Sequence, residues 1–192
     1  MTEGLPFRTG WHRFLQEVEL SRNYPMSYRL NAIGAAPRNP LLERILPSLL
    51  YIKLATLLDD ALQTHISDRK LTVPSKYHDS FGGRINFLAD HGALSEPRQW
   101  RRIKKRRNEL AHESDAHADW EELDNAISPA HNELQHLGFV GPRPRYEPFA
   151  ERSALRETSR ADALCECTYS FGLKRDEKIV VKIEWTSYIL KD

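Results

Sequence analysis

The apolar residues of this chain of 192 residues change their spacing once, and that change constrains the fold more than any other feature. Up to about residue 137 they recur every three or four positions, which is the period of an amphipathic helix. From about residue 163 they alternate with polar residues, which is the period of a half-buried strand. Because the two periods do not intermix, the sequence predicts a mainly α fold: an antiparallel bundle of about five helices with a C-terminal β-hairpin.

The helical part is expected to consist of segments separated by proline, glycine or polar breaks. They cover residues 11–33, with an interruption at Pro25, and residues 41–62, 81–90, 97–112 and 120–137, with a linker at residues 35–40. The segment 41–62 is apolar on more than one face, which is typical of a central helix with neighbours on two sides. Pro47 would kink this helix or mark a restart, whereas Pro129 would bend the last helix without ending it.

Capping residues stand before two of these helices. Ser80 is placed to cap the third, short helix. Ser95 is placed to cap the fourth, and Glu96 and Pro97 follow it as the first-turn acid and the early proline that favour a helix start.

The end of the chain is expected to form a separate extension, residues 142–192, after a helical domain of residues 1–141. Its alternating residues predict two strands, 163–171 and 179–185, joined by a polar connection, although no short Asn-Gly turn fixes their register. A lone hairpin is marginal in water, so its apolar face must pack on the helices, on a partner chain or on further strands.

The composition excludes several classes of protein. A net charge of +1 gives no overall attraction to nucleic acid, so any such binding must come from local clusters. Cys165 and Cys167 lie too close together to staple the fold, which indicates a reducing compartment, and the first residues lack the pattern of a signal peptide. Charged residues interrupt the most apolar stretch, so we expect no membrane span and a cytoplasmic location. No metal-ligand set or glycine-rich phosphate loop is found, and we expect no cofactor.

The segment 97–112 carries the most unusual polar residues. Seven of the ten residues from Arg98 to Arg107 are Lys or Arg, and seven acids lie between Glu109 and Asp124. Such a run is as compatible with a solvated helix face as with RNA contact, and the sequence leaves both open. At about 100° per residue, Arg107 projects from the apolar side of the helix, where an unpaired guanidinium is costly to bury. This apolar side consists of Trp100, Ile103, Leu110 and Ala111.

Further polar residues share a neighbouring face of the same helix. Asn108 and His112 are four residues apart and therefore stack, with Lys105 and Arg101 one to three turns earlier. Glu109 is placed to pair with Arg106 or Arg102 across a helical turn.

Arg107, Asn108 and His112 resemble the motif of HEPN domains, in which an Arg, often followed by a polar residue, precedes a His by four to six residues near a helix end. The spacing here is four. Residues 81–90 resemble the helix that precedes the motif helix in many HEPN proteins, and residues 7–140 have the all-helical layout of such domains. The last fifty residues have no counterpart in the resemblance.

The resemblance implies a metal-independent endoribonuclease, in which the 2′-hydroxyl of RNA attacks the adjacent phosphate. His112 would then move protons, Arg107 would stabilise the crowded negative charge, and Asn108 would orient the ring or hold the ribose. Arg101, Lys105 and Arg106 would bind RNA phosphates by charge. The family pairs two motifs across a dimer, so we expect a homodimer with a composite site. Cellular RNA and toxin-like or defence-related growth arrest would be the expected substrate and biology.

Other interpretations remain open. The chain could instead be a non-catalytic HEPN-like adaptor that binds a protein or RNA partner. A His near a helix C-terminus is commonly a capping or surface residue, and an Arg on an apolar face is commonly paired with a carboxylate. Some HEPN toxins are silenced by an antitoxin nucleotidyltransferase that modifies a Tyr two residues after the motif His. Here Ser114 occupies that position, which puts this form of control in doubt.

Overall fold

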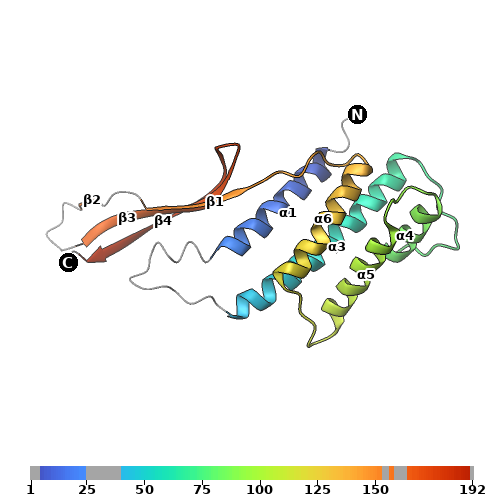
Figure 1. Cartoon of the computed structure of the whole chain (residues 1–192), viewed down its shortest axis with the longest axis horizontal. Coiled ribbons are helices and arrows are strands. Elements are labelled where there is room, and N and C mark those ends of the chain that lie inside the picture. The colour runs from blue at the N-terminus through green and yellow to red at the C-terminus, as the bar shows by residue number, and fades with distance from the viewer. Residues whose placement is uncertain (1–4, 25–39, 153–155, 158–163, 191–192) are drawn as a thin grey trace. The chain divides into compact units, whose positions relative to one another are not determined.

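The computed structural model describes residues 5–24, 40–152, 156–157 and 164–190. Within these residues five helices precede four strands, so the prediction of a mainly α fold with a C-terminal β extension is confirmed (Figure 1). The contacts divide the chain into two units, residues 1–14 with 39–143 and residues 15–38 with 144–192. Helix α1, Leu5–Asn23, therefore contributes its first half to unit 1 and its second half to unit 2. The helical segment expected after Pro25, and the linker as far as residue 39, lie outside the described residues.

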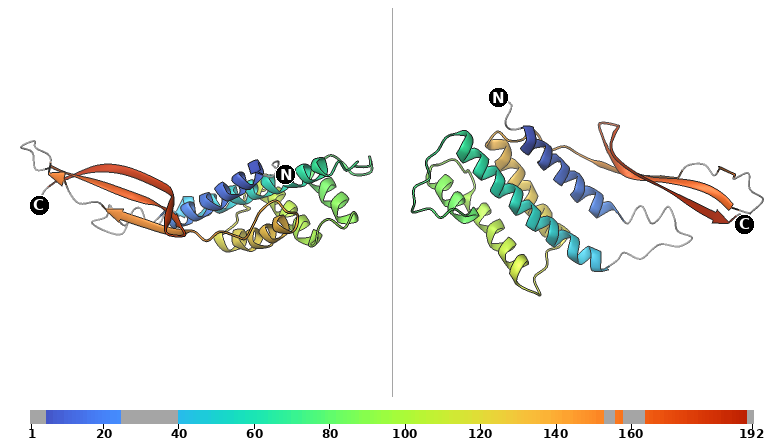
Figure 2. Two further views of the ribbon diagram at one scale, coloured as in Figure 1. Left: turned by 90° about the horizontal axis from the view of Figure 1, so that it is seen from above. Right: turned by 180° about the vertical axis from the view of Figure 1, so that it is seen from behind.

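Unit 1 is built around α3, Pro40–Asp68, which packs against α4, α5 and α6. The latter three helices are Phe81–Asp90, Pro97–His112 and Trp120–His136. The two views of Figure 2 show α3 running beside α6 along unit 1. The prediction of a central helix with neighbours on two sides is thus confirmed. Pro47 does not mark a restart, because α3 continues through it, and α6 likewise continues through Pro129.

The core of unit 1 consists of side chains at the apolar positions that the helical period predicts. Fully buried members include Trp11, Leu54, Leu58, Leu62, Leu123 and Ile127. An ion pair fixes α4 on α3, because Arg84 donates two hydrogen bonds to the carboxylate of Asp59 at 2.7 and 2.9 Å. No helix in the described part of the chain has the length and apolarity needed to cross a bilayer.

The start of α5 differs from the prediction. Ser80 caps α4 as expected, by accepting from the backbone N–H of Gly83 at 3.1 Å. At α5, however, the N-cap is Glu96, whose side chain makes no capping bond. The acceptor is instead Glu133 of α6, which is 2% exposed and takes hydrogen bonds from the backbone N–H groups of Ser95 and Glu96 and from the Ser95 hydroxyl. A carboxylate from another helix thus accepts from the backbone just before α5, and the Ser95 hydroxyl donates to that carboxylate in place of capping the helix.

The strands of unit 2 form one antiparallel sheet (Figure 1). They are β1 at Glu147–Arg152, β2 at Arg156–Glu157, β3 at Leu164–Arg175 and β4 at Lys178–Leu190. β3 pairs with β4 on one side and with β1 and β2 on the other, so the hairpin packs against further strands. Ala163, the first residue of the predicted strand, lies outside the described residues.

The prediction of a polar connection at residues 172–178 is wrong, because both strands extend into this range. Only Asp176 and Glu177 separate β3 from β4, with φ angles of 50° and 64°. Positive φ at both central residues is the geometry of a tight hairpin turn, which here forms without glycine. Gly172 remains within β3, where an added Cβ would lie 2.0 Å from the carbonyl oxygen of Val181.

On β3 the predicted inward residues Cys167, Tyr169 and Phe171 are buried, but Ser170 and Gly172 between them are buried as well, so the predicted burial on one face only is not observed there. The β4 strand is less covered. Ile179 and Ile183 are 50% and 47% exposed, whereas Trp185 stacks on Tyr169 with ring centroids 5.6 Å apart.

Candidate functional site

A groove of about 610 Å³ lies along the face of α5 that carries the predicted polar residues. We call it the motif groove. From α4 it is lined by Gly82 and Asn86, and from α5 by Arg101, Lys104, Lys105, Asn108 and His112 among others. Four of the predicted site residues, Arg101, Lys105, Asn108 and His112, are therefore brought together. Glu109 and Glu113 line it as well, so the groove gathers three cations, two carboxylates, two carboxamides and one histidine.

Arg107 borders this group from the buried side of α5. One of its terminal nitrogens donates to the Asn108 side-chain oxygen at 3.2 Å. Its Nε is buried and has no hydrogen-bond partner among the described residues. The predicted apolar side is correct for Trp100 and Ile103, which are 2% and 3% exposed, whereas Leu110 is only half-buried and Ala111 is exposed. The guanidinium thus reaches the motif groove through Asn108 and keeps an unsatisfied donor.

His112 occupies the last turn of α5, and its side chain is exposed. No hydrogen bond within the described residues fixes its imidazole, although the helix end itself is closed by the Glu113 N–H donating to the Glu109 carbonyl at 2.9 Å. The ring is therefore available to a substrate or a partner chain. A single copy supplies one such imidazole and one partly satisfied guanidinium.

Asn86 and Lys104 are groove residues that the sequence reasoning missed. The Arg101 Nε donates to the Asn86 side-chain oxygen at 3.1 Å, so α4 orients this arginine. A Cβ at Gly82 would lie 3.0 Å from the Lys104 ammonium, so the glycine leaves space for that cation. The sequence did hold a signal for Lys104, because it stands three residues after Arg101 and four before Asn108 and so shares their helix face. Nothing local indicated Asn86, because its partner is on another helix.

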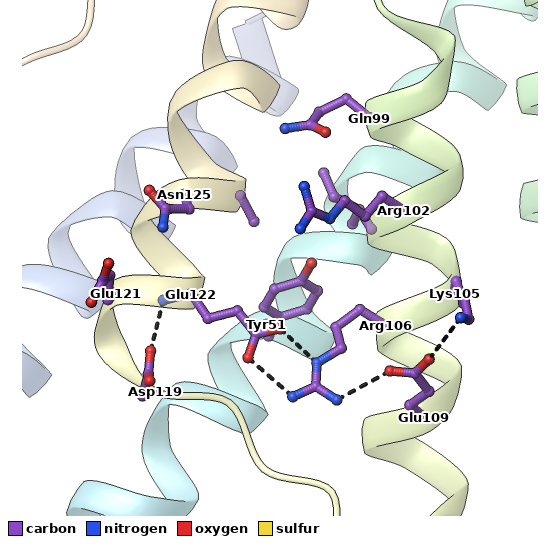
Figure 3. A pocket seen from close by; sticks show the side chains of 12 residues that line it. Tyr51, Gln99, Arg102, Lys105, Arg106, Glu109, Asp119, Glu121, Glu122 and Asn125 are labelled. Carbon is purple, nitrogen blue, oxygen red and sulfur yellow. Dashed lines mark hydrogen bonds and ion pairs between the residues drawn. The ribbon is translucent and has the colours of Figure 1, made fainter.

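Two predicted site residues do not line the motif groove: Arg107, which borders it through Asn108, and Arg106, which the structure places away from it. Arg106 lies on the opposite side of α5, in the groove of Figure 3, and donates to both carboxylate oxygens of Glu122 at 2.6 and 3.0 Å. It also binds Glu109 at 3.1 Å, which confirms the predicted pair, and the carbonyl of His117 at 2.8 Å. Hydrogen bonds to Glu122, and then to Glu109, raise the pKa of Arg106 above its ordinary value. Its guanidinium therefore ties α5 to α6 and has little capacity left for RNA.

No three His, Cys, Asp or Glu side chains gather as metal ligands do in the described ranges. No family model, no curated protein and no solved structure matches this chain.

Proposed function

We propose that this protein is a metal-independent endoribonuclease of the HEPN type, whose active site forms from the motif grooves of two copies. The observation that supports it best is the contact between Arg107 and Asn108, which links a guanidinium with a spare donor to the groove that holds His112. Each of the three groups offers what cleavage by a 2′-hydroxyl requires.

The proposed chemistry assigns one step to each side chain. His112 accepts the proton of the attacking 2′-hydroxyl or delivers one to the leaving oxygen, because an imidazole titrates near neutral pH. Arg107 pairs with the phosphate oxygens as their charge increases, and Asn108 holds the guanidinium and contacts the ribose. Single-stranded or loop RNA is the expected substrate, since its backbone can bend far enough for in-line attack.

The cations of the motif groove would hold the RNA strand. Arg101, Lys104 and Lys105 line it. Of these three residues only Lys105 has an ion pair within the described part of the chain, and this pair joins its exposed ammonium to Glu109 at 3.6 Å. Exposed pairs of this kind are weak, so a phosphate can replace the carboxylate. Such contacts position a strand without selecting its sequence.

A second copy of the chain would complete the site. α4 contacts the first half of α5, at Trp100, Arg101 and Lys104. On α3, Ile45 and Leu49 are 40% and 56% exposed and lie one turn apart on one face. A partner chain would cover the apolar residues and bring a second motif towards the first.

Two hydrogen bonds place the first half of α3 beside the connection from α5 to α6 and the start of α6. The Ser48 hydroxyl accepts from the Ala118 N–H at 2.8 Å, and the Glu43 carboxylate accepts from the Trp120 indole N–H at 2.9 Å. Both donors follow α5 within a few residues. The exposed apolar surface of α3 and the motif therefore lie at the same end of the unit.

The test is cleavage of total cellular RNA in the presence of EDTA. The wild type should cut, and His112→Ala should not. His136→Ala is the matched control, because His136 is likewise an exposed histidine in the last turn of a helix but lies outside the motif groove. Arg107→Ala should also abolish cleavage, and Asn108→Ala should weaken it. Equal cleavage by wild type and His112→Ala, or none by the wild type on a broad RNA panel, would contradict the proposal.

The products carry a second test of the mechanism. Attack by the 2′-hydroxyl leaves 2′,3′-cyclic phosphate ends, and RNA with a 2′-deoxy residue at the mapped cut should resist. tRNA or mRNA cut in the cytoplasm, with growth arrest as the result, is the biology we propose. An antitoxin partner would act without the tyrosine modification described above, since residue 114 is Ser.

The competing function is a non-catalytic adaptor, which the exposed Ile45 and Leu49 also favour because a partner protein would bury them. It assigns Arg107 and His112 structural roles. Replacement of each by Ala should then lower the melting temperature, because the groups left behind would be unsatisfied. Unchanged melting temperatures in both variants would reject structural roles for Arg107 and His112. If the wild-type protein leaves RNA uncut in the cleavage assay, that result would favour the adaptor.

A further inference from the structure

A second groove of about 710 Å³ lies on the other side of α5, between α5 and α6 (Figure 3). We call it the α5–α6 groove. Its floor is formed by Tyr51 of α3 together with Ile103 and Ala126. The proposed ribonuclease mechanism uses none of these three residues. A cleft of this volume is large enough for a small organic ligand.

Tyr51 presents its hydroxyl to this groove. The residue is 3% exposed as a whole, and its hydroxyl, which has no hydrogen-bond partner among the described residues, is not one of the fully buried partnerless groups. Figure 3 shows the ring between the two helices, with the hydroxyl directed towards the part of the groove that Arg102 enters. Burial, reinforced by the Glu122 charge and opposed by Arg106 and Arg102, raises the pKa of Tyr51 to about 12. The hydroxyl therefore stays protonated and keeps a donor to offer to a ligand in the groove.

Arg102 supplies a cation beside that hydroxyl. It is exposed on the groove wall and has no ion pair within the described ranges, unlike Arg106 on the next turn. The Gln99 carboxamide lies one turn before Arg102 on the same wall and extends across the groove in Figure 3. A guanidinium, a phenolic hydroxyl and a carboxamide thus converge from two helices.

The acids around the groove limit the charge that a ligand can bring. Glu122 and Glu109 bind Arg106, whereas Asp119, which accepts from the Glu122 N–H at 2.7 Å, and Glu121 are exposed acids without an ion pair in the described ranges. A doubly charged group would meet these carboxylates at close range. A singly charged group can pair with Arg102 while avoiding most of that repulsion.

We propose that the α5–α6 groove binds a small monocarboxylic acid. Its carboxylate pairs with the Arg102 guanidinium and accepts a hydrogen bond from the Tyr51 hydroxyl. Its apolar body lies on Ile103 and Ala126. Gln99 binds a polar substituent at the open end. Lys105 and Glu109 line both grooves, but none of the four residues that would bind the acid belongs to the motif groove, so its failure and the failure of the ribonuclease proposal are separate results.

The test is a nuclear magnetic resonance titration of the full chain with benzoate. Benzoate should bind saturably, whereas benzamide, which has the same body without the charge, should not. Inorganic phosphate should bind more weakly than benzoate. Arg102→Gln and Tyr51→Phe should each weaken benzoate binding by about tenfold, since each removes one donor to the carboxylate.

Arg98→Gln is the control, because Arg98 is exposed on the same helix but does not line the groove. It should bind benzoate like the wild type. Circular dichroism will show whether Tyr51→Phe keeps the fold. Arg102→Gln changes an exposed residue and should fold like the wild type, so its binding result can be interpreted even if Tyr51→Phe unfolds. Absence of saturable benzoate binding, equal binding of benzamide, tighter binding of phosphate, or wild-type affinity in Arg102→Gln would overturn the proposal.

Discussion

Arg106 and Arg107 are neighbours of one residue type, yet their surroundings differ completely. The guanidinium of Arg106 donates to two carboxylates and a carbonyl. Arg107 donates to one carboxamide and keeps a buried Nε without a partner among the described residues. A guanidinium has five donors, so Arg106 is nearly satisfied and Arg107 is not. The first arginine ties α5 to α6, whereas the second keeps a buried donor that no described residue satisfies.

Arg106→Ala should lower the free energy of unfolding by about 2 kcal/mol, because it leaves Glu122 and Glu109 without their shared cation in a partly buried site. Arg102→Ala, one turn earlier and exposed, should change it by less than about 0.5 kcal/mol. Urea unfolding of both variants measures the difference. Equal losses would show that the ion pairs of Arg106 contribute nothing specific.

His131 is a buried histidine that the fold keeps neutral. Its Nδ1 accepts from the Trp11 indole at 2.9 Å, and its Nε2 lies 3.0 Å from the Gly141 carbonyl oxygen, so the proton belongs on Nε2. Burial lowers the pKa of His131 below the ordinary value of 6.5, with Arg143 and His12 adding to the shift and the bond to Gly141 opposing it. The same cause lowers the pKa of His65.

The stability of the protein should therefore fall in mild acid. The unfolded chain takes up a proton near pH 6.5 and the folded chain only at lower pH, so stability is complete above 6.5 and decreases from there down to the folded pKa. Melting temperatures measured between about pH 8 and pH 5 should show this decline. His131→Gln should reduce the slope, and His136→Ala should keep it. If His131→Gln leaves the dependence of the melting temperature on pH unchanged, the assignment of this decline to His131 is contradicted.

At the scale of elements, the start of α5 depends on a residue of α6. Glu133 accepts from Ser95 and Glu96 at 2.6 to 3.1 Å, and thereby joins the helix that carries the motif to its neighbour. The position of the motif groove consequently depends on a carboxylate far from it in sequence.

Glu133→Ala should lower the free energy of unfolding by about 2 kcal/mol, because two backbone donors and a hydroxyl lose their acceptor at a buried position. Gln135→Ala, at an exposed position two residues later, is the control and should have little effect. Urea denaturation gives both values. A loss no larger than that of Gln135→Ala would mean that water replaces the carboxylate.

The helices α3 to α6 and the two hairpin strands were predictable from sequence because each depends on local spacing, whereas β1 and β2 were not predicted. α4, α5 and α6 begin and end within a few residues of the predicted positions, and Ser80 caps α4 as its position indicated. The role of Glu133 was not predictable, because its partners are 37 and 38 residues away. The turn at Asp176 and Glu177 was missed because neither residue is a glycine or asparagine.

The residues of the candidate site likewise include some that the sequence predicted and some that depend on the tertiary fold. Helical spacing placed Asn108 and His112 on one face of α5 with Arg101 and Lys105. It could not distinguish Arg106 from these residues, because the carboxylate of Glu122 that holds it comes from another helix. Asn86 and the Tyr51 hydroxyl likewise required the tertiary fold.

For the whole molecule, the proposal requires a homodimer. Leu49→Asp should shift the protein towards monomer at micromolar concentration, because it places a charge in the apolar surface that the second copy would cover. Val73→Asp is the control, since Val73 is 37% exposed in the loop between α3 and α4. Sedimentation velocity distinguishes the two forms. A wild type that is strictly monomeric would leave only a different partner chain to complete the site.

The most direct test of the composite site is RNA cleavage by mixed dimers. Wild-type protein is combined with increasing amounts of a variant that carries both Arg107→Ala and His112→Ala, unfolded and refolded together so that the chains exchange, at constant total protein. If both copies contribute to one site, cleavage in EDTA should fall as the square of the wild-type fraction, because only dimers of two wild-type chains are complete. A decline in direct proportion to that fraction, or no cleavage by the unmixed wild type, would contradict a composite ribonuclease site.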